Sequence, residues 1–248
     1  MITSEEKFMF DLHGYLVIKN VLSDKELTEL NTIASGKFDY SDPNRAIRED
    51  KISLWGDPFV TLIDHPRIIP YLTELIDPKY RIDHDYCLFM SKGDARGGLH
   101  GGPSLVGDHW YSYRDGEMRN GLCVVTFFLT DAPKGAGGFA CIPGSHKSNF
   151  SKTLSEDVKQ FERSTDYVVQ PSVKAGDALF FTEALIHGTM PWKADHERRA
   201  LLYKYSPGNS TWAKEYYDLR AYPTLTTRQK RIMSPPSSWT TRETVVDQ

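Results

Sequence analysis

The sequence predicts a mainly β protein, a jelly-roll barrel with helices packed against its outside. The first third of the chain is helical in character, and short strand-like segments follow from Tyr80 onward. Turn signals separate these segments, among them Lys134–Gly138 and Lys174–Asp177. Helices followed by many short strands are typical of a barrel that carries its helices on the outside.

The N-terminal part is expected to contain helices around one strand. Residues 4–14 have the pattern of a short helix, and residues 15–21 that of a strand. Ser23–Glu26 forms a capping box that opens an amphipathic helix. A further helix is expected from about 66 to 76, and the polar segment 38–55 is expected to be a loop that covers a site.

The remainder is expected to supply the barrel and a tail. Six strands are expected, at residues 81–90, 122–129, 139–142, 166–173, 178–181 and 200–206. The tail after Asn209 is aromatic and then proline-rich, with a weaker capping box at Thr226–Gln229. We therefore expect one domain over 1–248, with a helical part (1–79), a barrel (80–207) and a tail or lid (208–248).

Composition excludes several classes of function. The net charge of -3 and the pI of about 6.2 give no reason to expect binding to nucleic acid or an anionic membrane. The longest apolar run, "LCVVTFFL" at 122–129, is too short to cross a bilayer. The acidic N-terminus does not resemble a secretory signal, and the three cysteines lie far apart in apolar runs. The expected protein is cytoplasmic, keeps its cysteines reduced and acts on a small molecule; its oligomeric state is left open.

Two of the eight histidines are candidates for metal binding. His187 follows the apolar segment 177–186, which is expected to continue as a strand, and it precedes Gly188 and Thr189. His100 lies between glycine pairs in the motif "GGLHGGP" at 97–103. Imidazole is a common metal ligand, so these two residues form a candidate metal site; ordinary hydrogen-bonded histidines are the alternative.

An arginine and a hydroxyl near His187 suggest a carboxylate site. Arg198 lies eleven residues after His187, beyond an expected hairpin turn at residues 192–197. If that hairpin forms, Arg198 and Thr189 lie near each other on adjacent strands. Arginine binds carboxylates through two hydrogen bonds, so the pair suits the far end of a dicarboxylate. An exposed cross-strand pair is the alternative.

Two motifs resemble the phytanoyl-CoA dioxygenase family. They are "GGFACIPGSHK" at 137–147 and "VKAGDALFFTEALIHGT" at 173–189, followed by Arg198, and the resemblance spans roughly residues 8–207. It implies a double-stranded β-helix of the cupin-like kind and an enzyme that uses Fe(II), 2-oxoglutarate and O₂. By residue matching, the metal ligands would be His100 and His187. The co-substrate would be held by Arg198 with Thr189 and, less directly, Thr126.

The sequence departs from the family pattern at one point. The family's first iron ligands form an H-x-D motif, whereas Gly102 follows His100 in the carboxylate position. Non-haem iron oxygenases commonly use two histidines and one carboxylate. The His-x-Gly arrangement resembles the aliphatic halogenases of the same fold, in which chloride takes the vacant place. The resemblance thus implies an oxidoreductase acting on an unactivated C–H bond, a chlorinating halogenase with Gly102 at its halide site.

Other interpretations are open. Gly101 and Gly102 are alternatively only turn residues with positive φ. Another carboxylate is the second possibility: Asp108 lies on a flexible loop, whereas Glu183 is a poor candidate because four strand residues would separate it from His187 by about 13 Å. A hydroxylase with a substitute or absent third ligand, or a non-catalytic binding module, would then be the function.

Aromatic and basic side chains around residues 96–114 are candidates for substrate contact. These are Arg96, Trp110, Tyr111, Tyr113 and Arg114. They suit stacking on a planar group or pairing with an anionic one. An ordinary loop with packed aromatics is the equal alternative.

Overall fold

The computed structural model describes residues 2–39, 48–104 and 107–246, and its centre is a six-stranded antiparallel sheet. Across this sheet the strands are β1 (Tyr15–Ile18), β8 (Ala178–Thr182), β6 (Cys123–Phe128), β10 (Arg198–Ser206), β3 (Arg81–Met90) and β2 (Arg48–Asp50). Two further pairs are β7 (Gly138–Cys141) with β9 (His187–Met190), and β4 (Tyr111–Arg114) with β5 (Glu117–Asn120). The main sheet confirms the expected β character, whereas the strands of the described residues form three separate sheets and not one closed barrel.

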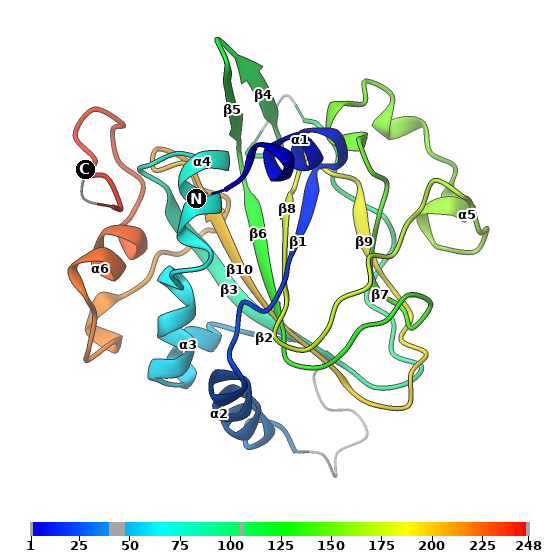
Figure 1. Ribbon diagram of the computed structural model, residues 1–248, viewed down its shortest axis with the longest axis horizontal. Coiled ribbons are helices and arrows are strands. Elements are labelled where there is room, and N and C mark those ends of the chain that lie inside the picture. Colours follow the sequence, from blue (N-terminus) through cyan, green and yellow to red (C-terminus); the bar gives the residue numbers. More distant parts are fainter. Residues whose placement is uncertain (1, 40–47, 105–106, 247–248) are drawn as a thin grey trace.

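Helices cover one face of the main sheet (Figure 1). The α-helices are α1 (Ser4–His13), α2 (Asp24–Ser35), α3 (Asp57–Thr61), α4 (Ile69–Leu75), α5 (Glu156–Lys159) and α6 (Thr227–Met233). Short 3₁₀ helices are η1 (Ile52–Trp55), η2 (Leu62–Asp64), η3 (Ser145–Lys147), η4 (Ser151–Thr153) and η5 (Leu219–Ala221). Capping boxes open α1, α2 and α6 from Thr3, Ser23 and Thr226. The helix that the sequence placed at 66–76 is α4.

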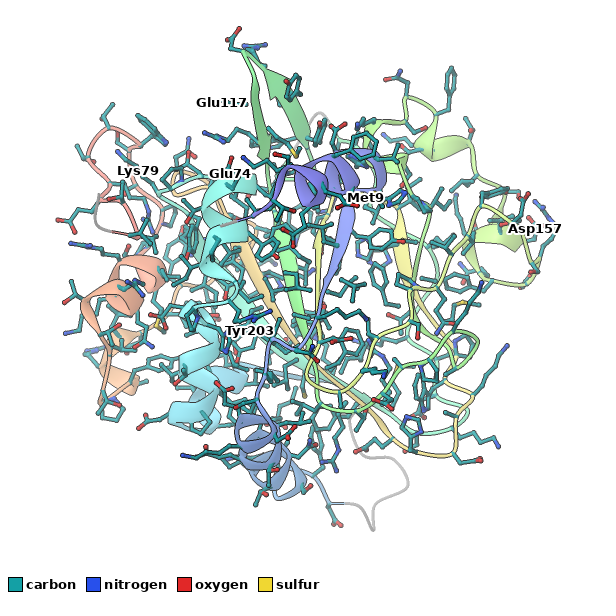
Figure 2. All side chains as sticks on the ribbon, in the orientation of Figure 1. Met9, Glu74, Lys79, Glu117, Asp157 and Tyr203 are labelled. Carbon is teal, nitrogen blue, oxygen red and sulfur yellow. The ribbon has the colours of Figure 1, made fainter. Side chains whose placement is uncertain are left out.

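Strand alternation divides the core into two layers. On the helix-covered face, Cys87, Phe127 and Leu201 pack against helix residues. Two tyrosines of β10 join that layer to the sheet, because Tyr203 donates to the Phe59 carbonyl at 2.8 Å and Tyr205 to that of Ile63 at 2.9 Å. Figure 2 shows Tyr203 in the interior, with Glu117 and Asp157 at the periphery.

The opposite face of the sheet looks toward the β7–β9 pair. Even-numbered residues of β6, of β10 up to Lys204 and of β3 from Tyr86 onward point this way, and Leu88, Phe128 and Ala200 form a second buried cluster with Cys141 of β7. This second layer encloses the candidate site described below.

Three expected elements differ in the structure. Residues 166–173 form isolated bridges at Val169 and Val173 and no strand, because Pro171 between them has no N–H to donate. The expected strand through 186 ends at Thr182, where the Leu185 amide donates to the Thr182 carbonyl at 2.9 Å and closes a turn. The expected loop 38–55 contains β2 and η1, and its residues 40–47 lie outside the described residues.

The expected hairpin between His187 and Arg198 is wrong. β9 pairs with β7, whereas β10 pairs with β3 and β6, so residues 191–197 connect two different sheets. Thr189 and Arg198 therefore do not lie on adjacent strands.

In the described residues, no helix is both long enough and apolar enough to span a bilayer.

Candidate active site

A cavity of about 200 Å³ between the main sheet and β7–β9 contains six of the residues singled out from the sequence. They are Arg96, His100, Thr126, His187, Thr189 and Arg198. The sequence did not identify the other lining residues, which are Arg48, Tyr86, Leu88, Phe139, Phe181, Leu202 and Lys204. Leu202 and Lys204 were within reach of sequence reasoning, since positions 200, 202 and 204 share a strand face with Arg198.

The two histidines are held together by their backbones. The His100 amide donates to the His187 carbonyl at 2.8 Å, and the His187 amide donates to that of His100 at 2.9 Å. Their ring centroids lie 4.4 Å apart. Gly188 permits this approach, because a Cβ there would lie 2.6 Å from the Gly98 carbonyl oxygen. The glycines beside both histidines thus let the 97–100 segment lie against β9.

Both rings are oriented in the same way by hydrogen bonds. Nδ1 of His100 lies 2.9 Å from the Gly98 carbonyl, and Nδ1 of His187 lies 2.8 Å from that of Leu185. A carbonyl only accepts hydrogen bonds, so each Nδ1 carries a proton, and in the neutral form of either ring Nε2 keeps its lone pair. Burial lowers the pKa of His187 to about 4, which keeps that ring neutral near pH 7. This is the tautomer and charge state that a metal ligand requires.

Arg198 is a buried cation without a carboxylate partner among the described residues. Its Nη1 donates to the Leu88 carbonyl at 3.4 Å, and its buried Nε has no hydrogen-bond partner in the described chain. Burial lowers the pKa of Arg198 to about 10, so the group stays charged at neutral pH. Gly138 of β7 lies against this side chain, since a Cβ there would be 2.7 Å from Nε. An incoming carboxylate is the partner that this guanidinium lacks.

The position of a Cβ on Gly102 points toward residues that do not line the cavity. A Cβ on Gly102 would lie 2.9 Å from Cβ of Ser151 and 3.3 Å from Cγ1 of Ile186, and neither of these residues lines the cavity. Gly101 and Gly102 have φ angles of 81° and 91°, as the turn-residue alternative requires. Within the described residues, no three His, Cys, Asp or Glu side chains converge into a preformed metal site.

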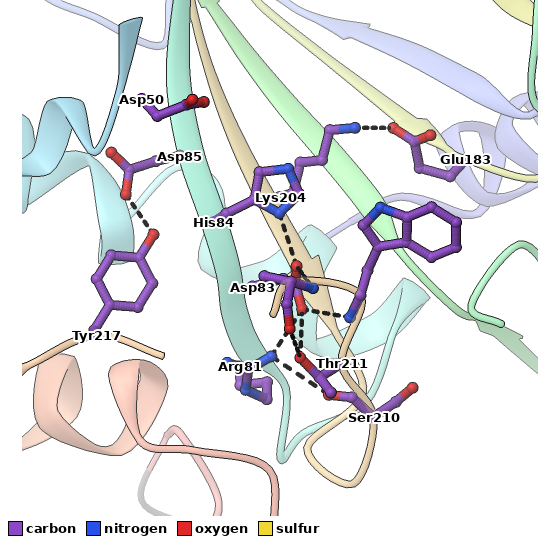
Figure 3. Close-up of polar contacts among 12 residues, drawn as sticks. Asp50, Arg81, Asp83, His84, Asp85, Glu183, Lys204, Ser210, Thr211 and Tyr217 are labelled. Atoms are coloured by element: carbon purple, nitrogen blue, oxygen red, sulfur yellow. Dashed lines mark hydrogen bonds and ion pairs between the residues drawn. The ribbon is translucent and has the colours of Figure 1, made fainter. Parts of the chain in front are cut away.

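The structure also locates the two alternative carboxylates. Asp108 is buried, accepts a short hydrogen bond from Ser210 and does not line the cavity. Glu183 corrects the distance expected from the sequence: its Oε2 lies 3.8 Å from Nε2 of His187, because the chain turns after Thr182 and does not continue as a strand. The other oxygen, Oε1, accepts from Lys204 at 2.7 Å (Figure 3).

The aromatic cluster expected near the substrate lies elsewhere. Tyr111 and Tyr113 belong to the β4–β5 hairpin and line a separate cavity beside α1, where Tyr111 donates to Asp11. Tyr113 is 65% exposed. Of the five residues proposed for substrate contact, Arg96 lines the cavity that contains His187.

A larger cavity of about 1040 Å³ lies beside the first, where the tail packs on β3. Asp83 accepts from the amides of Trp212 at 2.8 Å and Ala213 at 2.9 Å, and Asp85 accepts from Tyr217 (Figure 3). His84 lines the larger cavity and stacks on Tyr86, which lines the smaller one, with the ring centroids 5.9 Å apart. The tail therefore forms a wall of this larger cavity.

Part of the chain is similar to a known family. Residues 100–200 match the family model "Phytanoyl-CoA dioxygenase (PhyH)". A probable phytanoyl-CoA dioxygenase of Caenorhabditis elegans is 20% identical, with 83% of this chain and 76% of that protein covered.

Solved structures show the fold. HygX from Streptomyces hygroscopicus, with nickel and 2-oxoglutarate bound, superposes with a TM-score of 0.76 at 24% identity, covering 86% of this chain and 90% of HygX. A further HygX structure also contains hygromycin B. SnoN, an alpha-ketoglutarate-dependent epimerase from nogalamycin biosynthesis, gives 0.59 at 17% identity over 82% and 81% of the two chains. The main sheet and its helices thus match structures of the double-stranded β-helix kind.

Proposed function

We propose that this chain is an Fe(II)- and 2-oxoglutarate-dependent oxygenase similar to the phytanoyl-CoA dioxygenase family, and that it oxidises an unactivated C–H bond of a small molecule in the His100–His187 cavity. The observation that carries the proposal is the meeting of three features in one cavity: two imidazoles oriented through Nδ1 by backbone carbonyls, a buried guanidinium without a carboxylate partner among the described residues, and two hydroxyls. Bound iron with 2-oxoglutarate and O₂ would supply an oxidant that removes hydrogen from carbon.

Eight of the lining residues have a task in this proposal. His100 and His187 would hold the metal through Nε2, and their Nδ1 hydrogen bonds keep the rings oriented. Arg198 would bind the distal carboxylate of 2-oxoglutarate, and the hydroxyls of Thr126 and Thr189 are available as further donors. Phe139, Phe181 and Leu202 supply apolar walls that limit access of water to the site.

The substrate is proposed to bind in the larger cavity beside this one. That cavity is walled by the tail and adjoins the metal cavity at His84 and Tyr86. A relative, HygX, contains hygromycin B in one structure, which supports a small organic molecule as the class of substrate.

Halogenation is a second candidate reaction, favoured by one observation. Gly102 has no side chain to coordinate a metal, so chloride would complete the metal site and be transferred to carbon. The direction of a Cβ at Gly102, toward Ser151 and Ile186, argues against it, because a carboxylate there would not have pointed into the cavity.

Two experiments test these proposals. Anaerobic addition of Fe(II) and 2-oxoglutarate should give the visible charge-transfer band of a chelated keto acid, and its absence from folded protein would favour a non-catalytic binding module. A substrate screen read by mass, run with chloride, with bromide and without halide, separates the reactions. A gain of one oxygen, or another oxidation independent of halide, supports the oxygenase; a product that carries the added halide supports the halogenase.

A further inference from the structure

Glu183 is an acidic side chain that lies beside His187, one of the two candidate metal ligands. Its Oε2 is 3.8 Å from Nε2 of His187 and 3.8 Å from Nε2 of His109. Two atoms that each bind one metal ion at about 2.0–2.2 Å lie no more than about 4.4 Å apart, taking zinc as a guide. Glu183 and His187 therefore already lie within the separation of two ligands of one ion.

The turn after β8 places this carboxylate. Leu185 donates its amide to the Thr182 carbonyl at 2.9 Å, and the Glu183 amide donates to the Leu122 carbonyl at 2.8 Å. Gly101 makes room for the turn, since a Cβ there would lie 2.9 Å from the Glu183 carbonyl oxygen. The glycine next to His100 thus brings the His100 segment against the turn that carries Glu183.

The two oxygens of Glu183 have different surroundings. Oε1 accepts from the ammonium of Lys204 at 2.7 Å, which fixes one side of the carboxylate. Oε2 faces the two imidazole nitrogens, and Nε2 of His109 has no hydrogen-bond partner among the described residues. Glu183 is 3% exposed, so its charge depends on nearby positive groups and not on water. A divalent cation at Oε2 is a partner of the kind that this side of the carboxylate lacks.

We propose that Glu183 supplies the third protein ligand to the metal of His100 and His187, in place of the carboxylate missing at Gly102. This inference rests on the proposed function. Asp108 is the weaker candidate because one of its oxygens accepts from Ser210, whereas Oε2 of Glu183 lies 3.8 Å from Nε2 of His187. With Glu183 coordinated, the protein provides two imidazoles and one carboxylate, and the metal needs no halide ion.

The experiment measures metal affinity and not turnover. Mn(II) and anaerobic Fe(II) are titrated calorimetrically, with 2-oxoglutarate present, into the wild-type protein, Glu183→Gln and Lys204→Gln. Both variants break the same buried ion pair, but only Glu183→Gln removes the carboxylate. We expect Glu183→Gln to weaken metal binding at least about tenfold, with Lys204→Gln within about threefold of wild type. Equal affinities in the two variants would show that Glu183 is structural and would overturn the assignment.

Two further measurements keep the result decisive if a single variant unfolds. The double variant Glu183→Gln/Lys204→Gln removes both charges together; it should fold and bind the metal as weakly as Glu183→Gln, and wild-type affinity in it would refute the assignment. Chloride should leave the anaerobic Fe(II)–2-oxoglutarate spectrum of the wild type unchanged. A chloride-dependent shift would mean that an external anion, and not Glu183, completes the site.

A His187→Ala variant separates this inference from the proposed function. If His187→Ala loses the metal while Glu183→Gln retains it, only the Glu183 assignment fails. If the wild type itself binds neither metal nor 2-oxoglutarate, or if His187→Ala binds metal as well as wild type does, the proposed function fails as well.

Discussion

Gly138 of β7 and Arg198 of β10 lie in contact across the space between two sheets, with the position of a Cβ on Gly138 only 2.7 Å from Nε of Arg198. A side chain at 138 would displace the guanidinium. We expect Gly138→Ala to weaken 2-oxoglutarate binding and to lower the free energy of unfolding by about 1–2 kcal/mol, because φ there is +80°. Calorimetric titration and denaturant unfolding measure these effects.

Gly135→Ala is the matched control for that change. Gly135 also has positive φ, at 90°, and no heavy atom lies within 4 Å of its Cβ position. Gly135→Ala should therefore lower the free energy of unfolding only through the unfavourable positive φ. Equal 2-oxoglutarate affinity in the two variants would mean that the position of Arg198 does not matter for binding.

Replacing Arg198 should remove the anchor for 2-oxoglutarate. Truncating one partner of a buried charge pair typically costs about 2–5 kcal/mol of binding, so Arg198→Gln should weaken 2-oxoglutarate at least about thirtyfold while Mn(II) affinity alone stays close to that of the wild type. Arg199→Gln is the control, because Arg199 pairs with Glu197 at 2.6 Å and donates to Asn31 of α2. Loss of binding only in Arg199→Gln would move the anchor to that residue.

Gly102→Asp tests whether a carboxylate at this position can reach the metal. Its Cβ would meet Ser151, and its φ of +91° is unfavourable for aspartate. We expect a lower melting temperature with no gain in Mn(II) affinity. Gly116 has a φ of +83° and open space around its Cβ position, so Gly116→Asp measures the loss of melting temperature that comes from the positive φ alone. A tighter Mn(II) site in Gly102→Asp would support the halogenase interpretation.

Stability should fall in mild acid because of His146. Burial lowers the pKa of His146 to about 4 from 6.5. The His146 ring is therefore protonated below about pH 6.5 in the unfolded chain but only below about pH 4 in the folded protein. His146 therefore contributes stability above pH 6.5 that is lost between pH 6.5 and 4, by at most about 1.4 kcal/mol per pH unit. Denaturant unfolding across this range should be less steep in His146→Gln; an unchanged slope would contradict the assignment.

Asp83 should control the order of the tail. It receives the amides of Trp212 and Ala213 and pairs with the buried Arg81 at 2.9 Å. Asp83→Ala leaves Arg81 without this partner, at a cost of about 3–5 kcal/mol, and should raise hydrogen exchange in residues 210–222. Asp218→Ala, whose carboxylate pairs with the exposed Arg220, is the control and should leave that exchange unchanged outside its own turn.

Much of the fold followed from local patterns in the sequence. The capping boxes at Ser23 and Thr226 begin helices, and the strand expected at 81–90 is β3. The sequence did not reveal which strands pair. The separation of β9 from β10 depends on contacts with β7 and β6, which no local pattern encodes.

The candidate site shows the same division between local and non-local information. His100, His187, Thr126, Thr189 and Arg198 were selected from motifs and share a cavity. Glu183 was rejected because an apolar segment was extended as a strand through Ile186. Thr182 instead begins a turn that its own hydroxyl supports, accepting the Ala184 amide at 3.3 Å. A threonine or serine at the end of an apolar run is the local signal that was available.

Asp83 and Asp85 of β3 hold the tail that walls the larger cavity, and neither residue belongs to the candidate metal site. They bind residues 212–217 to the main sheet, whereas the imidazoles are held by β9 and the segment bridged to it, and the guanidinium by β10. Grafting a different C-terminal segment onto the same sheet would accordingly remodel which molecules are admitted and leave the reacting apparatus as it stands.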